Sequence, residues 1–214
     1  QLALFSAPIR VVININFLKT LSQEAINSGM GEILKLLIIG GNEFFKIYNR
    51  YVQKGQVARF TYYRLLILAA LSVKKSIVER DEFELGIRRS LNYGHTLGHI
   101  IEVLSGYKIP HGEAVVVGII IINELSAWKG ILSKSLNLQL KKLLFDLIDK
   151  KIKKYMHNLS LERFKELLKK DKKTLRNTVN LVLIRKPGDI YFLPVNLSDS
   201  LISEITKIIK LNFN

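Results

Sequence analysis

Apolar residues recur at helical spacing through most of this 214-residue sequence, and no other feature restricts the fold as much. Leu140, Leu143 and Leu147 illustrate the pattern, since residues three and four positions apart lie on one face of a helix. Ser22 is a typical N-cap, and the glycine pair at 40–41 is a typical stop signal. We therefore predict helices over residues 22–40, 42–51, 57–79, 87–104, 112–128, 136–154, 160–170 and 198–211.

Only three short segments have the pattern of β-strands. Residues 9–15 are a β-branched run, and the apolar segments 179–184 and 190–195 flank a Pro-Gly turn at 187–188, which predicts a hairpin. The sequence contains no alternating series of strands and helices and no Gly-rich turn from a strand into a helix. We therefore predict a mainly α-helical fold with a few short strands, without a nucleotide-binding α/β domain.

The composition restricts the class of protein. Apolar residues make up 48% of the chain, enough to fill a sizeable core. Cysteine is absent, which excludes disulfides and thiolate metal sites and fits a reducing compartment. The first residues lack the zones of a signal peptide, and the apolar run 114–122 is too short to cross a bilayer. We therefore expect a soluble, cytoplasmic protein that does not bind membranes.

The formal net charge of +15 favours a polyanionic partner, such as nucleic acid, a membrane surface or a small polyanion. Much of the excess lies in residues 141–154 and 165–173, where lysines accompany apolar residues at helical spacing. This pattern is typical of solvated helix faces, and no nucleic-acid motif with interleaved aromatic residues occurs. We therefore predict no binding to nucleic acid.

Three of the four histidines fall within one short stretch. His95 and His99 lie four apart on a predicted helix, one turn from each other, and His111 follows a loop at the start of the next helix. Imidazoles that converge in this way suit a divalent metal such as zinc, which in catalytic sites keeps one position open. The alternative is that the histidines next to Gly94 and Gly98 only pack at a close helix contact. Three together favour a metal or catalytic site.

Spacing does not determine which side chains would bind the metal. Taken alone, it favours His95 and His99 as a pair, with Glu102 or Glu113 near enough to complete a set.

The histidine stretch resembles the 3-dehydroquinate synthase family of sugar phosphate cyclases. The resemblance is carried by DEFELGIRRSLNYGHTLGHIIE at 81–102, PHGEAVVVG at 110–118, FLKTLSQEAINSGMGEILK at 17–35 and KKDKK at 169–173. It implies that residues 1–214 correspond to the multi-helical C-terminal domain of that fold, which binds metal and substrate. Residues 1–20 would correspond to the interdomain strand and a segment that contacts NAD.

The resemblance also implies residue roles. Glu32, His95 and His111 match the metal ligands, and His99 matches a histidine that takes part in proton transfer and does not bind the metal. Glu84 matches an acidic position beside the metal. The positions that match substrate-binding residues are Lys35, Lys74, Arg88, Asn92 and Lys172. The positions that match the NAD-contacting segment are Phe17, Leu18, Lys19 and Thr20.

The implied activity is that of a phosphate lyase in the shikimate pathway of aromatic amino acid biosynthesis. It converts 3-deoxy-D-arabino-heptulosonate 7-phosphate, a phosphorylated keto acid, to 3-dehydroquinate and phosphate. The implied cofactors are Zn2+, or another divalent metal such as Co2+, and NAD+, bound mostly by a nucleotide-binding half outside this chain. We expect a homodimer and a separate nucleotide-binding polypeptide as partners. The alternatives are another sugar phosphate cyclase, or a non-catalytic module that retains the fold.

Overall fold

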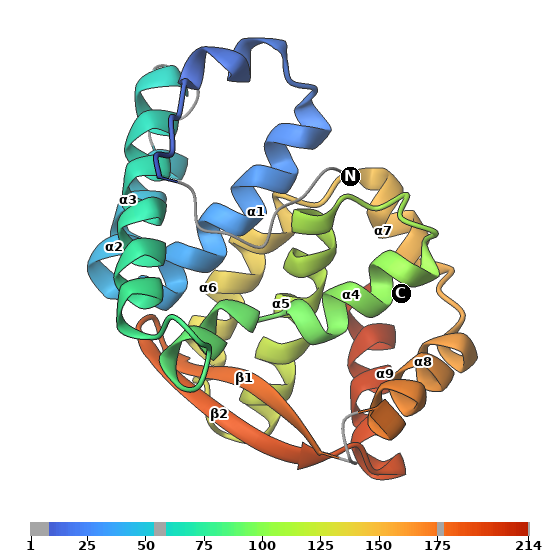
Figure 1. The fold of residues 1–214 in the computed structure, drawn as a ribbon. Helices are drawn as coiled ribbons and strands as arrows, with labels where there is room; N and C mark the ends of the chain where they lie inside the picture. Colours follow the sequence, from blue (N-terminus) through green and yellow to red (C-terminus); the bar gives the residue numbers. More distant parts are fainter. Residues whose placement is uncertain (1–8, 54–58, 175–177, 214) are drawn as a thin grey trace.

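The computed structural model describes residues 9–53, 59–174 and 178–213, and Figure 1 shows their arrangement. The mainly helical fold that the sequence predicts is confirmed. The α-helices are α1 (Gln23–Gly40), α2 (Asn42–Gln53), α3 (Arg59–Arg80), α4 (His95–Leu104), α5 (His111–Trp128), α6 (Lys134–Phe145), α7 (Lys150–His157), α8 (Leu161–Thr174) and α9 (Asp199–Phe213). Two 3-10 helices, η1 (Ile15–Thr20) and η3 (Ile87–Asn92), and two strands, β1 (Thr178–Lys186) and β2 (Asp189–Asn196), complete the described elements.

Helix α5 lies at the centre of the molecule (Figure 1). It packs against α1, α4, α6, α9 and β1, and almost every residue from Gly112 to Ser126 is buried. A helix that is apolar on all sides is expected in such a core position. Among the described helices, α5 is also long and apolar enough to cross a membrane, but 78% of it is buried inside the protein, which is typical of a core helix.

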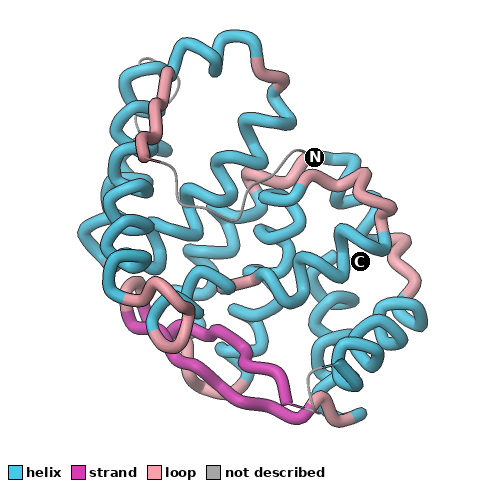
Figure 2. The backbone as a smooth tube through the Cα atoms, in the orientation of Figure 1, coloured by secondary structure: helices cyan, strands magenta, loops and turns pink. Residues whose placement is uncertain are grey.

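The two strands form the predicted antiparallel hairpin, drawn in magenta in Figure 2. The turn contains Gly188, whose backbone φ of +83° lies in the left-handed region that favours glycine. All four residues of β1 from Leu181 to Ile184 are buried, because α5 packs against β1 and η3 also contacts it. The hairpin therefore covers one end of the helical core.

The predicted strand at residues 9–15 is wrong for the residues that the structure describes. Residues 9–14 form no regular element, and η1 begins at Ile15, with the Asn14 side chain accepting a hydrogen bond from the Asn16 backbone at 3.0 Å. Val11 and Val12 are 70% and 80% exposed. A strand requires a neighbouring strand to bond its backbone, and no described strand lies next to this segment.

Two of the predicted helices are each interrupted. Residues 87–104 divide into η3 and α4 at Gly94, whose φ is +79° and whose backbone lies so close to α5 that a Cβ atom would come within 2.4 Å of the Ile119 side chain. Residues 136–154 divide into α6 and α7, because the Asp149 carboxylate accepts a hydrogen bond from Ile152 N at 2.8 Å and caps a new helix. Ser22 caps α1 as predicted.

Candidate metal site

Two close helix crossings bring α1, α4 and α5 together at one end of the core. A Cβ atom on Gly112 would lie 1.9 Å from the Ser28 carbonyl oxygen of α1, and one on Gly118 would lie 2.1 Å from the Gly94 carbonyl oxygen. Only glycine allows backbones to approach this closely. The close helix contact at Gly94, on which the alternative to a functional site rested, therefore exists, and it brings α4 and α5, which carry the histidines, close together.

Glu32 of α1, His95 of α4 and His111 of α5 converge at these crossings. Glu32 Oε1 lies 3.8 Å from His95 Nε2 and 3.6 Å from His111 Nε2. This oxygen is buried and has no hydrogen-bond partner, whereas Glu32 Oε2 accepts from Lys35 Nζ at 2.8 Å. One carboxylate oxygen and two imidazole nitrogens around a shared space are a donor set that zinc and similar divalent ions bind. These three residues therefore fit such an ion.

Hydrogen bonds on the far side of each ring determine which nitrogen is available. His95 Nδ1 lies 3.3 Å from the Tyr93 carbonyl oxygen, and His111 Nδ1 lies 3.1 and 3.2 Å from the two carboxylate oxygens of Glu102. A carbonyl or carboxylate oxygen only accepts, so Nδ1 carries the proton in both rings. In a neutral ring the lone pair is then on Nε2, the nitrogen that faces Glu32 in both histidines.

The charges of these groups also suit a cation. Burial lowers the pKa of His95 to about 4, with a further contribution from the nearby Lys35 ammonium, so the imidazole is neutral at pH 7. Burial alone would raise the pKa of Glu32, but Lys35, His95 and His111 together outweigh it and the pKa is lowered. The cluster thus combines an ionised carboxylate with a neutral imidazole.

Lys35 is buried next to this cluster, with 3% of its surface exposed. Its Nζ lies 3.4 Å from His95 Nε2 in addition to its ion pair with Glu32. Burial lowers the pKa of Lys35, Glu32 opposes this effect, and the positive charge of Lys74 on α3 adds to it. Lys35 therefore lies beside the histidines, and Lys74 is near enough to Lys35 to repel its charge.

His99 occupies a more open position. Its side chain is 60% exposed, and its Nε2 lies 4.0 Å from a Glu102 oxygen, beyond hydrogen-bonding distance. The ligand atoms of His95, His99 and His111 nevertheless lie within 4.8 Å of one another. His95 and His111 could therefore bind an ion together with either Glu32 or His99, which gives two overlapping ligand sets.

Glu113, which spacing also suggested as a ligand, has different surroundings. It is completely buried, and the Asn27 side chain, which lowers the Glu113 pKa slightly, lies near its carboxylate without a well-formed hydrogen bond. Burial raises its pKa to about 7, and the carboxylates of Asp149 and Glu24 add to this shift. A carboxyl group with this pKa is protonated below pH 7 and about half protonated at pH 7.

A second group of predicted site residues lies in and before η3. Asn92 donates to Glu84 Oε1 at 2.6 Å, the Arg88 guanidinium donates to the Glu82 carbonyl, and Arg89 Nε donates to the Glu84 carbonyl at 3.2 Å. Glu84 has a φ of +57°, which is uncommon for a residue other than glycine.

A cavity of about 260 Å³ lies between this group and β1; its lining residues are Glu84, Arg89, Asn92, Asn180 and Val182. Among the described contacts, Glu84, Arg88 and Asn92 bond within their own segment and not with the histidines.

The remaining predicted site residues are Lys172, in the C-terminal part of the chain, and the segment 17–20 near the N-terminus. Lys172 lies within α8, but its side chain is outside the described part of the structure. The segment that the resemblance assigns to NAD contact forms η1. There, Phe17 is 71% exposed, and the Thr20 hydroxyl donates to the Phe17 carbonyl at 3.0 Å.

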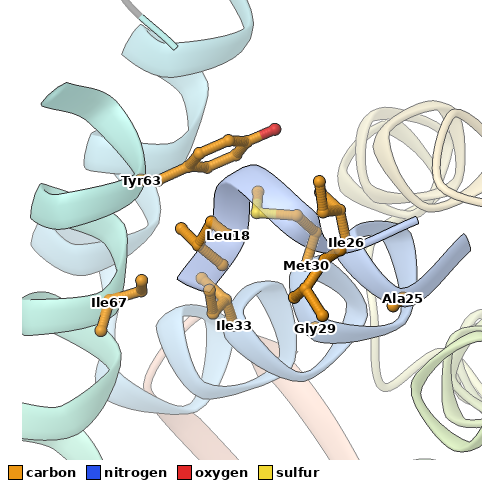
Figure 3. A pocket seen from close by; sticks show the side chains of 9 residues that line it. Leu18, Ala25, Ile26, Gly29, Met30, Ile33, Tyr63 and Ile67 are labelled. Carbon is orange, nitrogen blue, oxygen red and sulfur yellow. The ribbon is translucent and has the colours of Figure 1, made fainter. Parts of the chain in front are cut away.

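Leu18 of η1 lines a small apolar pocket against α1 and α3, opposite Tyr63 and Ile67 (Figure 3). Phe17 is not among the residues that line this pocket, whose walls are almost entirely apolar. Such a pocket does not supply the backbone donors that bind a pyrophosphate. The assignment of residues 17–20 to NAD contact therefore stays a prediction.

Sequence reasoning did not identify the two groups that accept hydrogen bonds from the Nδ1 atoms of His95 and His111. The Tyr93 carbonyl is a backbone group with no sequence signal, and Glu102 was considered only as a ligand. The i,i+3 spacing of His99 and Glu102 was visible, but the contact between Glu102 and His111 depends on the path of the loop between α4 and α5.

Comparison with known proteins gives consistent results. The C-terminal family of 3-dehydroquinate synthase matches residues 29–174. The 3-dehydroquinate synthase of Legionella pneumophila (strain Lens) is 36% identical over 189 residues, which cover 87% of this chain and 50% of the relative. That of a Nitratiruptor species is 34% identical over 206 residues, covering 92% and 55%. The chain thus spans about half the length of the curated relatives it matches.

Solved structures share the fold at low sequence identity. A crystal structure of 2-deoxy-scyllo-inosose synthase complexed with carbaglucose-6-phosphate, NAD+ and Co2+ has a TM-score of 0.70 at 19% identity, covering 92% of this chain and 54% of that one. A 2-epi-5-epi-valiolone synthase from Streptomyces hygroscopicus subsp. jinggangensis 5008, with NAD+ and Zn2+ bound, has a TM-score of 0.68 at 20% identity, covering 93% and 54%.

Proposed function

This chain belongs to the 3-dehydroquinate synthase family, and from that membership we propose that it forms the metal- and substrate-binding half of a 3-dehydroquinate synthase. The whole enzyme would convert 3-deoxy-D-arabino-heptulosonate 7-phosphate to 3-dehydroquinate and phosphate, the shikimate-pathway step that the resemblance implies. In this proposal residues 1–214 act as one domain.

One observation carries the proposal. The buried Glu32 Oε1 has no hydrogen-bond partner and lies 3.6–3.8 Å from the Nε2 atoms of His111 and His95. A buried acceptor without a donor is costly unless an ion or another ligand satisfies it. We assign Glu32, His95 and His111 as ligands of a zinc or similar divalent ion.

The residues around this site suit a polyanionic substrate. When bound, a divalent ion here would polarise substrate hydroxyls and favour their ionisation. Lys35 and Lys74 bring positive charge to the same place, and Arg88 and Lys172 would supply further donors to the substrate's carboxylate and phosphate. His99 is exposed next to the cluster, where its imidazole can accept or give a proton to a bound substrate.

The proposed reaction also needs NAD+, which accepts and then returns a hydride. The chain's own contribution would be the exposed segment from Phe17 to Thr20. Among the described residues no strand leads through a Gly-rich turn into a helix, so the phosphates of NAD+ would be held by a nucleotide-binding half outside these 214 residues. That half would be a separate polypeptide or another part of a longer chain.

Another sugar phosphate cyclase activity is the second candidate, because the solved structures with this fold include enzymes with other products. Those structures are at most 20% identical and support the fold alone. The relatives at 34–36% identity are 3-dehydroquinate synthases, and they favour the dehydroquinate reaction.

The metal assignment is tested by elemental analysis of the chain after removal of metal and reloading with Zn2+. We expect one zinc per chain in the wild type and almost none in His95→Ala. Wild-type protein without zinc, or an undiminished zinc content in His95→Ala, would contradict the assignment.

The activity is tested by mixing the zinc-loaded chain with the nucleotide-binding half of a relative and NAD+. We expect phosphate release from 3-deoxy-D-arabino-heptulosonate 7-phosphate only when both halves are present, and none with His95→Ala as the matched control. Release from a different sugar phosphate instead would support the second candidate. Failure with every phosphate tested, despite bound zinc, would favour a non-catalytic module.

A further inference from the structure

The Glu102 carboxylate contacts His111, the histidine of the proposed metal site whose Nδ1 faces a side chain and not a backbone carbonyl. Both of its oxygens lie close to His111 Nδ1, at 3.1 and 3.2 Å. The Glu102 side chain is 13% exposed, whereas that of His111 is 45% exposed. The partly buried carboxylate therefore holds an imidazole that is itself rather open to solvent.

The loop between α4 and α5 brings these two residues together although they lie nine positions apart. The Glu102 carbonyl accepts hydrogen bonds from Tyr107 N and from Ser105 Oγ, both at 2.8 Å. Ser105 Oγ in turn accepts from Ile109 N at 3.3 Å, and Tyr107 adopts a φ of +59° in this tight turn. Glu102 thus closes the turn with its backbone and reaches His111 with its side chain.

His95 and His111 are held in different ways. The Nδ1 atom of His95 faces the Tyr93 carbonyl, a backbone group at the end of η3, two residues before α4 begins. His111 is the first residue of α5, and its Nδ1 faces a side chain instead. A substitution can therefore remove the support of His111 without touching the ligand, which is not possible for His95.

We propose that Glu102 is a positioning residue, which fixes the ring and the tautomer of His111 so that Nε2 faces the ion. The inference rests on the proposed metal site at Glu32, His95 and His111. Because Glu102 contacts Nδ1, it lies on the side of the ring that the ion does not use and is not itself a ligand. Carboxylates that hold metal-bound histidines in this way commonly strengthen metal binding about 10- to 100-fold.

The test is the zinc affinity of the 214-residue chain, measured at one fixed pH by competition with a chromophoric chelator. We expect Glu102→Ala to weaken zinc binding about 10- to 100-fold. Glu102→Gln should weaken zinc binding less, because the amide oxygen of the glutamine still accepts from His111 Nδ1–H. The glutamine variant provides the test if the alanine variant does not fold. The matched control is Glu124→Gln, since Glu124 is 14% exposed and pairs with Lys141 at 2.8 Å within another part of the chain; its zinc affinity should equal that of the wild type.

A double-mutant cycle distinguishes positioning from a general effect on the fold. If Glu102 acts through His111, Glu102→Ala should weaken zinc binding no more than about twofold in a His111→Ala background. Equal losses in both backgrounds would overturn the inference, as would Glu102 variants that bind zinc as tightly as the wild type does. Either of these results would overturn the role of Glu102 but not the proposed metal site. A wild-type chain that binds no zinc would overturn both the proposed function and this inference.

Discussion

Glu32 and Glu113 are carboxylates on the two helices that cross most closely, α1 and α5, yet their surroundings have opposite charge. Glu32 faces the Lys35 ammonium and two imidazoles, and its pKa is lowered although burial alone would raise it. Glu113 is buried near Asp149 and Glu24, and burial together with these carboxylates raises its pKa to about 7.

The difference shows that burial does not by itself decide the charge of a carboxyl group in this core. Neighbouring charges decide it, because burial raises the pKa of both groups and only Glu32 has cations beside it. Both carboxylates have an oxygen without a hydrogen-bond partner. Only the Glu32 oxygen combines ionisation with two facing imidazole nitrogens, so a cation is expected there, whereas Glu113 is about half protonated at pH 7.

The largest effect is expected where an ammonium loses its buried partner. In metal-free protein, Glu32→Ala leaves Lys35, whose side chain is 4% exposed, without its carboxylate. We expect the free energy of unfolding to fall by about 2–3 kcal/mol, less than for a completely buried pair because Glu32 is partly exposed. Denaturant unfolding in the presence of a chelator measures this.

The chain contains a matched control for this experiment. Glu43 and Lys46 form an ion pair with the same i,i+3 spacing at 2.6 Å, but their side chains are 82% and 49% exposed. Glu43→Ala should change the free energy of unfolding by less than about 1 kcal/mol, as is usual for surface pairs. An equal loss of unfolding free energy in the two variants would show that the ion pair between Glu32 and Lys35 stabilises the protein no more than a surface pair does.

A smaller effect of opposite sign is expected at Glu113. Its folded-state pKa of about 7 lies above the ordinary 4.5, so the unfolded chain releases this proton first as the pH rises. The stability contribution of Glu113 therefore falls between about pH 4.5 and pH 7, and the loss is complete above pH 7. Glu113→Gln removes this titration, and relative to the wild type the variant should gain about 1–2 kcal/mol between pH 5 and pH 8. Unfolding curves at both pH values check this, and a pH-independent difference between the proteins would contradict the raised pKa.

The sequence predicted the elements that depend on local signals. Ser22 caps α1, and the Pro-Gly turn at 187–188 joins the two strands, because caps and turns are formed by neighbouring residues. The strand at 9–15 was wrong because a β-branched run becomes a strand only beside a partner. The break between α6 and α7 was missed because Leu147 and Ile148 are buried within it, so the apolar pattern continues where the helix does not.

The candidate site could be predicted to a similar extent. The histidine stretch and the resemblance indicated which residues would meet, and the structure brings Glu32, His95 and His111 together. The support of His111 by Glu102 could not be predicted, because it depends on a turn in which Tyr107, a residue other than glycine, adopts a left-handed backbone conformation.

The smallest effect on metal binding is expected at His99, and it decides between the two overlapping ligand sets. If the ion lies on the Glu32 side of the cluster, the exposed His99 contributes no ligand atom. His99→Ala should then bind zinc within about threefold of the wild type, a loss smaller than that expected for removing even a residue that positions a ligand. In the two-half assay the same variant should release little phosphate, because its proton-transfer group is missing. A zinc loss as large as that of His95→Ala would instead make His99 the third ligand. The unpartnered oxygen of Glu32 would then need another explanation, and the contrast between Glu32 and Glu113 would no longer locate the metal.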